Sequence, residues 1–195
     1  MRNSAARKIT SGENKIMTIS KIWHWFANPP VDGPTATILL RLMAGGVFFW
    51  EGILKFVFAN QGVGRFTKLG FPLPELTANF VGVGEIALGL LLIFGLFTRF
   101  ITFYFIIQMI VAVLSTKISI FLGTNPLPAP PAPPITGFWA VLHEVRSDYA
   151  QIMTSAFILI VGPGRLSLDA FFSRAKASKA YVKGDSIDGA FQVAK

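Results

Sequence analysis

Long apolar runs separated by short polar segments make up most of this chain, and the pattern predicts a membrane protein built from helices. Each run approaches the ~20 residues that a helix needs to cross a bilayer, although the last one is short. The runs are residues 36–58, 76–97, 100–122 and 147–161. Only Thr98 and Arg99 separate the second run from the third, so these two runs should form a tight antiparallel hairpin. The sequence therefore predicts an all-α, integral membrane four-helix bundle spanning residues 36–163.

A short helix in the membrane interface is predicted before the first span, within an amino-terminal tail of residues 1–35. Residues 16–27 place Trp23, Trp25 and Lys21 among aliphatic side chains, which is typical of a helix lying at headgroup depth. Translation could start at Met1 or at Met17, because the first residues carry no pattern of their own.

A second short helix is predicted in the carboxyl-terminal tail, residues 164–195. Gly162 and Gly164 end the last span, and residues 166–172 then form a helix capped by Ser167. The residues after 175 carry mixed charge and few apolar side chains, which predicts disorder over most of that stretch.

Lysine and arginine residues predict the orientation. Of the fifteen that lie in the loops and tails, twelve belong to the two tails and the Thr98–Arg99 turn, and only Arg65, Lys68 and Arg146 lie on the other side. Because basic residues are retained in the cytoplasm, both termini should be cytoplasmic. The membrane is expected to be the plasma membrane, of the bacterial inner-membrane kind.

Polar side chains inside the apolar runs mark the predicted functional interior. A charge at bilayer depth costs about 2.5–3.5 kcal/mol on insertion scales, so these residues should face the bundle interior. On a helical wheel, the polar residues of each span fall on one face, within about 80° of arc or less, and in the second span Gly82 and Gly89 share the face of Glu85. The predicted ligand-binding residues are Arg41, Glu51, Lys55, Glu85, Gln108, Asp148 and Gln151.

Glu85 is the best catalytic candidate among these residues. Glu51 and Lys55 are one turn apart and correctly spaced for an ion pair, which could be structural alone. Glu85 has no such partner on its own span, so it is either protonated or paired with Lys55 or Arg41 across the bundle. The expected role of Lys117 is a lysine reaching towards the membrane surface.

Composition agrees with a membrane protein and excludes several functions. The chain is 52% hydrophobic and 14% charged, with a mean hydropathy of +0.56. Its net charge of +8 lies mostly in the tails, where it suits an anionic membrane surface better than nucleic acid. The absence of cysteine excludes thiol chemistry and iron–sulfur clusters. His24 and His143 fall on opposite sides of the predicted membrane, which argues against a haem, and no metal site or covalently bound cofactor is expected.

Residues 38–170 resemble the DoxX-like family of small four-helix membrane proteins. The resemblance rests on residues 39–56, 70–100 and 147–169, above all on Glu85, on Thr98–Arg99 and on the segment from Gly162 to Asp169. It implies a membrane oxidoreductase or the membrane partner of one, because the family includes relatives of a thiosulfate:quinone oxidoreductase subunit.

Two functions remain open from the sequence. The first is a quinone-interacting membrane subunit in which Glu51, Glu85 and Gln108 bind the ring and handle its protons, with electrons coming from a redox partner or from a substrate. The second is non-enzymatic, either a membrane scaffold or a small-molecule permease. Transport would require an oligomer such as a homodimer, because four short spans without an evident repeat do not form an alternating-access transporter.

Overall fold

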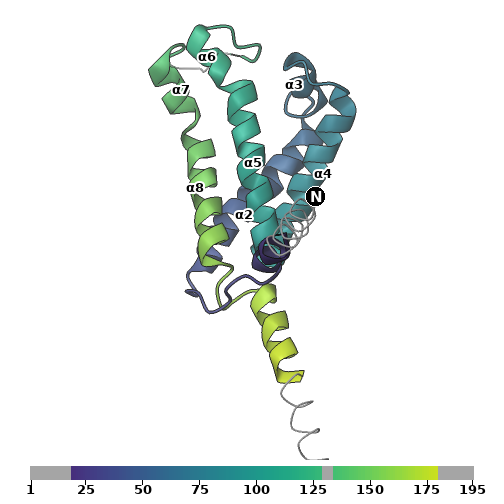
Figure 1. The fold of residues 1–195 in the computed structure, drawn as a ribbon. Coiled ribbons are helices and arrows are strands. Elements are labelled where there is room, and N and C mark those ends of the chain that lie inside the picture. The colour runs from purple at the N-terminus through teal and green to yellow at the C-terminus, as the bar shows by residue number, and fades with distance from the viewer. Residues whose placement is uncertain (1–18, 129–133, 180–195) are drawn as a thin grey trace, which may run out of the picture.

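The computed structural model describes residues 19–128 and 134–179, and every regular element in these ranges is a helix (Figure 1). The named helices are α2 (Thr37–Val57), α3 (Val63–Lys68), α4 (Pro74–Phe94), α5 (Thr98–Thr116), α6 (Ile118–Leu122), α7 (Phe138–Glu144) and α8 (Arg146–Val161). Residues 19–27 and 168–179 are also helical. We call the end of the molecule that carries α3, α6 and α7 the distal end. The opposite end, with residues 95–97 and 162–167, is the terminal end (Figure 1).

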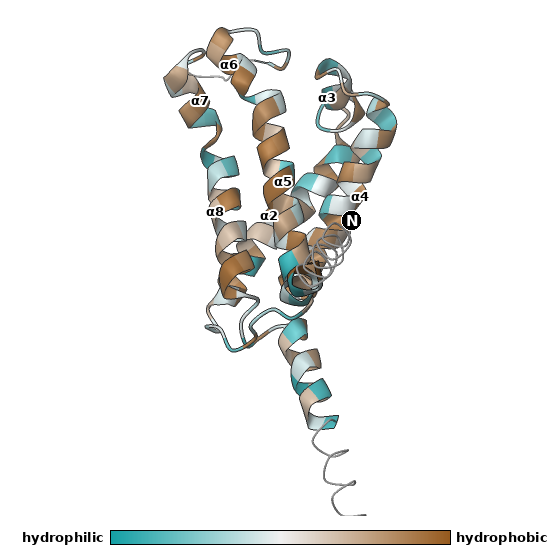
Figure 2. Ribbon diagram, viewed as in Figure 1, coloured by the Kyte–Doolittle hydropathy of each residue, from teal (hydrophilic) through white to brown (hydrophobic). Residues whose placement is uncertain are grey.

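Three of the helices are long and apolar enough to cross a membrane: Thr37–Val57, Pro74–Phe94, and α5 continued by α6 over Thr98–Leu122. Large apolar side chains on them face outwards, with Trp50 64% exposed and Phe80 69% exposed, as contact with lipid requires. Figure 2 shows hydrophobic residues along most of α5. Three of the predicted spans are thus candidate membrane-spanning helices in the structure, whereas α8, with 16 residues, is shorter.

Glycines allow α2 and α4 to pack as an antiparallel pair with their backbones in contact. A Cβ atom built on Gly45 would lie 2.7 Å from the carbonyl oxygen of Gly89, and one on Gly52 would lie 2.7 Å from that of Gly82. The predicted inner face of α4 is confirmed, since Gly82, Glu85 and Gly89 are all buried. Small residues serve this purpose at membrane helix interfaces, where close backbone approach maximises packing.

Gly45→Ala should therefore destabilise the bundle by about 2 kcal/mol, because the added methyl group meets backbone atoms of α4 that cannot move independently. Gly46→Ala is the matched control, since a Cβ atom there has no neighbour within 4 Å. Thermal unfolding in detergent measures both. Equal stability of the two variants would contradict the close α2–α4 contact.

A second antiparallel pair is formed by α5 and α8, and the two pairs meet at an apolar core. Phe48 of α2 stacks on Phe105 of α5, with ring centroids 3.6 Å apart and planes 8° apart. Leu92 and Ile158 complete this core from α4 and α8. Towards the distal end α4 and α5 diverge (Figure 1). They are therefore not the closely packed hairpin that the sequence predicted.

The connection between α4 and α5 also differs from the prediction. Helix α4 ends at Gly95, whose φ of +70° is left-handed and favours glycine. Thr98 and Arg99, predicted as the turn, are the first two residues of α5, and both are buried. The turn consists of residues 95–97, because the left-handed glycine reverses the chain before Thr98.

The carboxyl-terminal segment docks on this turn through Asp169. Its carboxylate accepts hydrogen bonds from the backbone N–H groups of Phe97 (3.0 Å) and Thr98 (3.1 Å) and from Thr98 Oγ1 (2.8 Å). Asp169 N–H donates to the carbonyl of Gly95 at 2.9 Å. A residue 71 positions away along the chain therefore caps the start of α5, where unpaired N–H groups need acceptors.

Arg99 joins three segments at the terminal end. Its Nε donates to the Leu159 carbonyl at 3.0 Å and its Nη1 to the Trp25 carbonyl at 2.6 Å. The guanidinium also lies 3.8 Å from the centre of the Trp25 ring. Only 5% of Arg99 is exposed, so this one side chain fastens the helix at residues 19–27 and the end of α8 to α5.

The helix in the carboxyl-terminal tail is longer than predicted. It begins at residue 168 rather than 166, and Ser167 Oγ accepts a hydrogen bond from the Ala170 N–H at 3.1 Å, as a capping residue does. It continues through residues 176–179, for which the sequence predicted disorder. The prediction for residues 180–195 and the question of Met17 lie outside the described residues.

Candidate functional site

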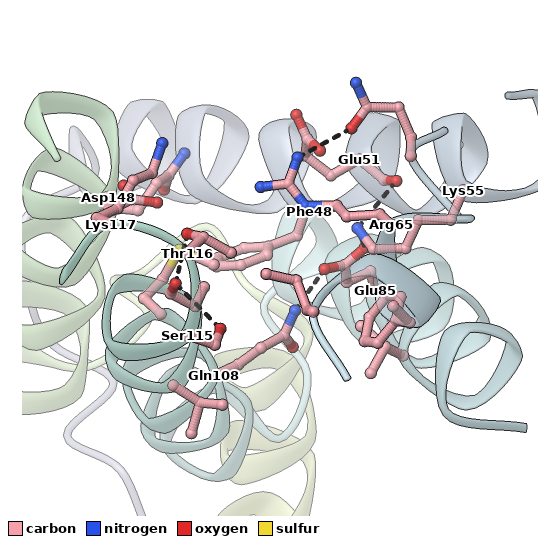
Figure 3. Close-up of a pocket in the computed structure, with 18 of the residues that line it drawn as sticks. Phe48, Glu51, Lys55, Arg65, Glu85, Gln108, Ser115, Thr116, Lys117 and Asp148 are labelled. Atoms are coloured by element: carbon pink, nitrogen blue, oxygen red, sulfur yellow. Dashed lines mark hydrogen bonds and ion pairs between the residues drawn. The ribbon is translucent and has the colours of Figure 1, made fainter. Parts of the chain in front are cut away.

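A cavity of about 370 Å³ opens between the two helix pairs on the distal side of the Phe48–Phe105 core. Helices α2, α4, α5 and α8 form its walls, together with residues around α3. The divergence of α4 from α5 and the polar residues on the facing sides of the helices create it. Figure 3 shows Glu85 and Lys55 on one side of this space and Asp148 and Lys117 on the other.

Glu85 is buried at the centre of a three-residue network whose other two members are partly buried. Lys55 Nζ donates to Glu85 Oε2 at 2.5 Å, and Gln108 Nε2 donates to Glu85 Oε1 (Figure 3). The Glu85 side chain is 3% exposed and that of Lys55 is 11% exposed. Both carboxylate oxygens are thus held, one by a charge from α2 and the other by an amide from α5, so the orientation of the carboxylate is fixed.

The predicted ion pair between Glu51 and Lys55 does not form. Lys55 instead donates to the backbone carbonyl of Glu51 at 3.3 Å and pairs with Glu85 across the bundle. The reason is the close contact of α2 and α4 at Gly52 and Gly82, which brings Lys55 within reach of the buried carboxylate. The Glu51 side chain still lines the cavity. The sequence offered this cross-bundle pair only as one of two alternatives for Glu85.

Three oxygen atoms of residues that line the cavity have no hydrogen-bond partner among the described residues. Asp148 Oδ2 and Gln151 Oε1 of α8 and Gln108 Oε1 of α5 are buried and accept no hydrogen bond from any described residue. Buried polar atoms are nearly always paired, so unpaired acceptors lining a cavity indicate a ligand or ordered water as their partner. Three acceptors on one cavity favour a ligand that donates hydrogen bonds.

Six of the seven predicted ligand-binding residues line this cavity, and Arg41 does not. Arg41 is 1% exposed, and its Nη2 donates to the Leu166 carbonyl at the terminal end, against Gly95. Helical periodicity placed it on the same face as Lys55, but the rise of the helix puts these residues about four turns apart. Its position indicates a role in holding the carboxyl-terminal segment.

Arg65 and Lys117 are cavity residues that the sequence did not predict as such. Arg65 follows the first span and approaches the cavity through α3, where its Nη1 donates to Gln61 Oε1 at 3.5 Å. Lys117, expected to reach towards the membrane surface, points into the cavity region and pairs with Glu144 at 3.4 Å. The only signal for Arg65 was that it is a basic residue in a turn-rich loop, a property it shares with Lys68.

The charges that line the cavity balance. Three carboxylates face three cationic side chains, so the enclosed space suits a neutral, polar molecule with apolar parts better than an ion. The lining residues with charge are Glu51, Glu85, Asp148, Lys55, Arg65 and Lys117. Among the described residues no group of three or more metal-binding side chains comes together. Of the three carboxylates, Glu85 is the one held by hydrogen bonds on both oxygens.

Three comparisons with known proteins bear on this site. The family model described as DoxX matches residues 36–118, which include Glu51, Lys55, Glu85 and Gln108. An uncharacterized membrane protein of Mycobacterium tuberculosis is 37% identical over 149 residues, covering 73% of this chain and 85% of the relative. The Bacillus subtilis protein named "Putative oxidoreductase CatD" is 28% identical over 141 residues, covering 72% of this chain and 89% of that protein.

No solved structure matches the chain. The similarity to the mycobacterial membrane protein extends over most of both sequences, and the match to the family model includes the helices that carry Glu85 and its two partners. The candidate membrane-spanning helices and the match in sequence agree, and the chain belongs to the DoxX family of membrane proteins.

Proposed function

We propose that this protein is a quinone-interacting membrane subunit of a redox system, with the cavity around Glu85 as the binding site of the ring. The observation that carries the proposal is the buried carboxylate of Glu85, held by Lys55 and Gln108 beside a cavity with unpaired acceptors. The name of the Bacillus relative, which includes "oxidoreductase", supports a redox role. A quinone takes up two electrons and two protons on reduction, so its site needs a proton-exchanging group.

The donor and acceptor pattern of the cavity fits the reduced ring. A hydroquinone has two hydroxyl groups that donate hydrogen bonds, and Asp148 Oδ2, Gln151 Oε1 and Gln108 Oε1 are buried acceptors without partners among the described residues. Apolar residues such as Val81 and Met109 line the rest of the cavity and suit the faces of the ring. The residues present therefore fit this ligand.

In this proposal each member of the network has a distinct task. Glu85 takes up or releases a proton at a carboxylate oxygen. Lys55 balances the negative charge of Glu85 in a setting of low dielectric, and Gln108 fixes the direction of the carboxylate. Electrons come from a redox partner or from a substrate, since the sequence has no cysteine, no pair of histidines on one side of the predicted membrane and no nucleotide-binding motif.

The direct test is extraction of the protein purified in mild detergent, followed by absorbance and mass analysis of the organic phase. We expect a quinone in near-stoichiometric amount, and we expect Gln151→Leu to lower the amount retained because it removes an unpaired acceptor from the cavity. Met153→Leu, on the exposed face of the same helix, is the matched control and should leave the retained quinone unchanged. Absence of quinone together with no binding of an added quinone analogue would leave the scaffold as the better proposal.

We further propose that α8 forms a fourth span and that both termini lie in the cytoplasm of a bacterial cell. The antiparallel order of α2, α4, α5 and α8 returns the chain to the terminal end, where residues 19–27 and the 162–167 segment both lie (Figure 1). The distribution of Lys and Arg supports the direction.

Reporter fusions test this topology. A reporter joined after Arg174 should be active only as a cytoplasmic reporter, and one inserted at Pro126 only as an extracytoplasmic reporter, because twelve of fifteen loop and tail cations belong to the two tails and the Thr98–Arg99 segment. A cytoplasmic signal from the Pro126 insertion would contradict the proposed orientation.

A further inference from the structure

A second cavity, of about 290 Å³, lies at the distal end beside the first one. Residues around α3 form one side, and the end of α5, the segment after α6 and the end of α7 form the other. Four residues line both cavities: Gln61, Arg65, Thr116 and Lys117. The second cavity therefore adjoins the site around Glu85, and we call it the distal vestibule.

The lining of the distal vestibule contains more cations than carboxylates, and two of its cations, Arg65 and Lys117, also line the inner cavity. Arg65, Lys68 and Lys117 contribute three positive charges, and Glu144 is the one carboxylate in the lining. Glu144 pairs with Lys117 at 3.4 Å. In the part of the chain that the structure describes, no carboxylate lies within ion-pair distance of Arg65 or Lys68. Arg65 and Lys68 thus both face the vestibule without being engaged in an ion pair.

Neutral donors accompany these cations. Asn125 Oδ1 accepts hydrogen bonds from Ser119 Oγ (3.3 Å) and from the Leu127 N–H (3.3 Å), which leaves its Nδ2 group to donate. The vestibule also contains Asn60 and Gln61. Gln61 Oε1 accepts from Arg65, so its amide nitrogen is likewise a donor. A guanidinium, an ammonium and side-chain amides converging on one space form an arrangement that binds oxyanions and carboxylates.

We propose that the distal vestibule is a binding site for an anionic group, either a small oxyanion or carboxylate from solution or the phosphate of an anionic lipid. The site goes beyond the proposed function, because it takes a second, charged ligand beside the neutral one. Since Arg65 and Lys117 line both cavities, a bound anion would lie next to the molecule in the inner cavity. Lys68 lines the vestibule alone and therefore separates the two sites in an experiment.

The probe is inorganic phosphate, titrated against the full-length protein in detergent at constant ionic strength and followed by the rise in thermal unfolding temperature. We expect saturable stabilisation, and we expect Lys68→Gln to weaken phosphate binding about tenfold, as loss of one charge-assisted contact does.

Glu144→Gln should act in the opposite direction and strengthen phosphate binding, because it removes the one negative charge in the lining of the vestibule and frees Lys117. Arg146→Gln is the matched control at the same end, since Arg146 lines neither cavity, and it should bind as the parent protein does.

A second arm distinguishes the source of the anion. In nanodiscs of phosphatidylcholine alone, phosphate should bind as in detergent. In nanodiscs containing phosphatidylglycerol, loss of phosphate binding identifies the lipid headgroup as the occupant, and unchanged binding identifies a soluble anion. Equal phosphate binding by the parent, Lys68→Gln and Glu144→Gln proteins, or no binding in either medium, overturns the site. Binding of a quinone analogue is measured separately on the same Lys68→Gln protein and should be unchanged, so failure of either proposal is visible without the other.

Discussion

Glu85→Gln is expected to lower the free energy of unfolding by about 3 kcal/mol, because it leaves a buried lysine without its counter-charge. The Lys55 ammonium lies 2.5 Å from Glu85 Oε2 and its side chain is 11% exposed. An amide in place of the carboxylate keeps the shape of the side chain but not its charge. We expect a loss of stability at the lower end of the range for broken buried ion pairs. The reason is that the Glu51 carbonyl still accepts a hydrogen bond from the Lys55 ammonium. Thermal and denaturant unfolding in detergent measure it.

The double variant Glu85→Gln with Lys55→Met separates stability from function. Removing both charges should restore most of the lost stability, because an unpaired charge no longer remains inside the bundle. Proton exchange should stay absent, since an amide does not titrate in the accessible pH range. Turnover of a short-chain quinone with the native redox partner, or its binding where no partner is known, supplies the functional measurement.

Glu51→Gln is the matched control for stability. Glu51 has the same side chain, lines the same cavity and makes no ion pair among the described residues, so its replacement should change the free energy of unfolding by less than about 1 kcal/mol. A Glu85→Gln protein as stable as the Glu51→Gln protein would contradict the Lys55–Glu85 pair. A double variant with full activity would remove Glu85 from the proposed mechanism.

Arg99→Gln should destabilise the protein by about 3 kcal/mol or more, through loss of charge-assisted hydrogen bonds in a buried setting. Arg99 donates to carbonyls of Trp25 and Leu159, which glutamine cannot reach together, and the contact with the Trp25 ring is lost as well. Arg99→Lys should recover little of this stability. A guanidinium has donors pointing in several fixed directions and can bond to two segments at once, whereas an ammonium on a shorter side chain cannot. Thermal unfolding in detergent gives the ranking.

Arg174→Gln is the control for Arg99, since Arg174 is exposed on the helix of residues 168–179 and makes no hydrogen bond or ion pair within the described chain. It should unfold at the temperature of the parent protein. Because Arg99 lies at the terminal end, the Arg99→Gln protein that remains folded at low temperature should bind a quinone analogue normally. Loss of binding in the folded fraction would contradict the separation of this end from the cavity.

Most of the residues that gave the family resemblance stabilise the fold and do not line the cavity. Thr98, Arg99 and Asp169 meet at the terminal end, where they cap α5 and fasten the two terminal segments. Glu85 is the exception, since it lies on the cavity with Lys55 and Gln108. This division explains why the same few residues indicate a family in sequence and yet say little about a reaction.

Hydropathy and helical period were sufficient to predict the long helices and the inner face of α4, but not the short helices α3 and α7. Apolar runs of spanning length have few alternatives to a helix, because backbone groups in lipid must be paired within the segment. The same reasoning predicted that Gly82, Glu85 and Gly89 share a buried face. Six of the seven predicted ligand-binding residues line the cavity for that reason: a charge in an apolar span is stable only towards the interior.

Which of these residues meet depends on how the helices pack, and only the tertiary structure decides it. Local spacing favoured Glu51 as the partner of Lys55, but the contact of Gly52 with Gly82 brings Glu85 closer. The helical wheel grouped Arg41 with the cavity residues, although its place along the axis puts it at the terminal end. A one-dimensional pattern determines the face on which a residue lies. The crossing of two helices, set by where small residues let backbones touch, determines which faces and which depths come together.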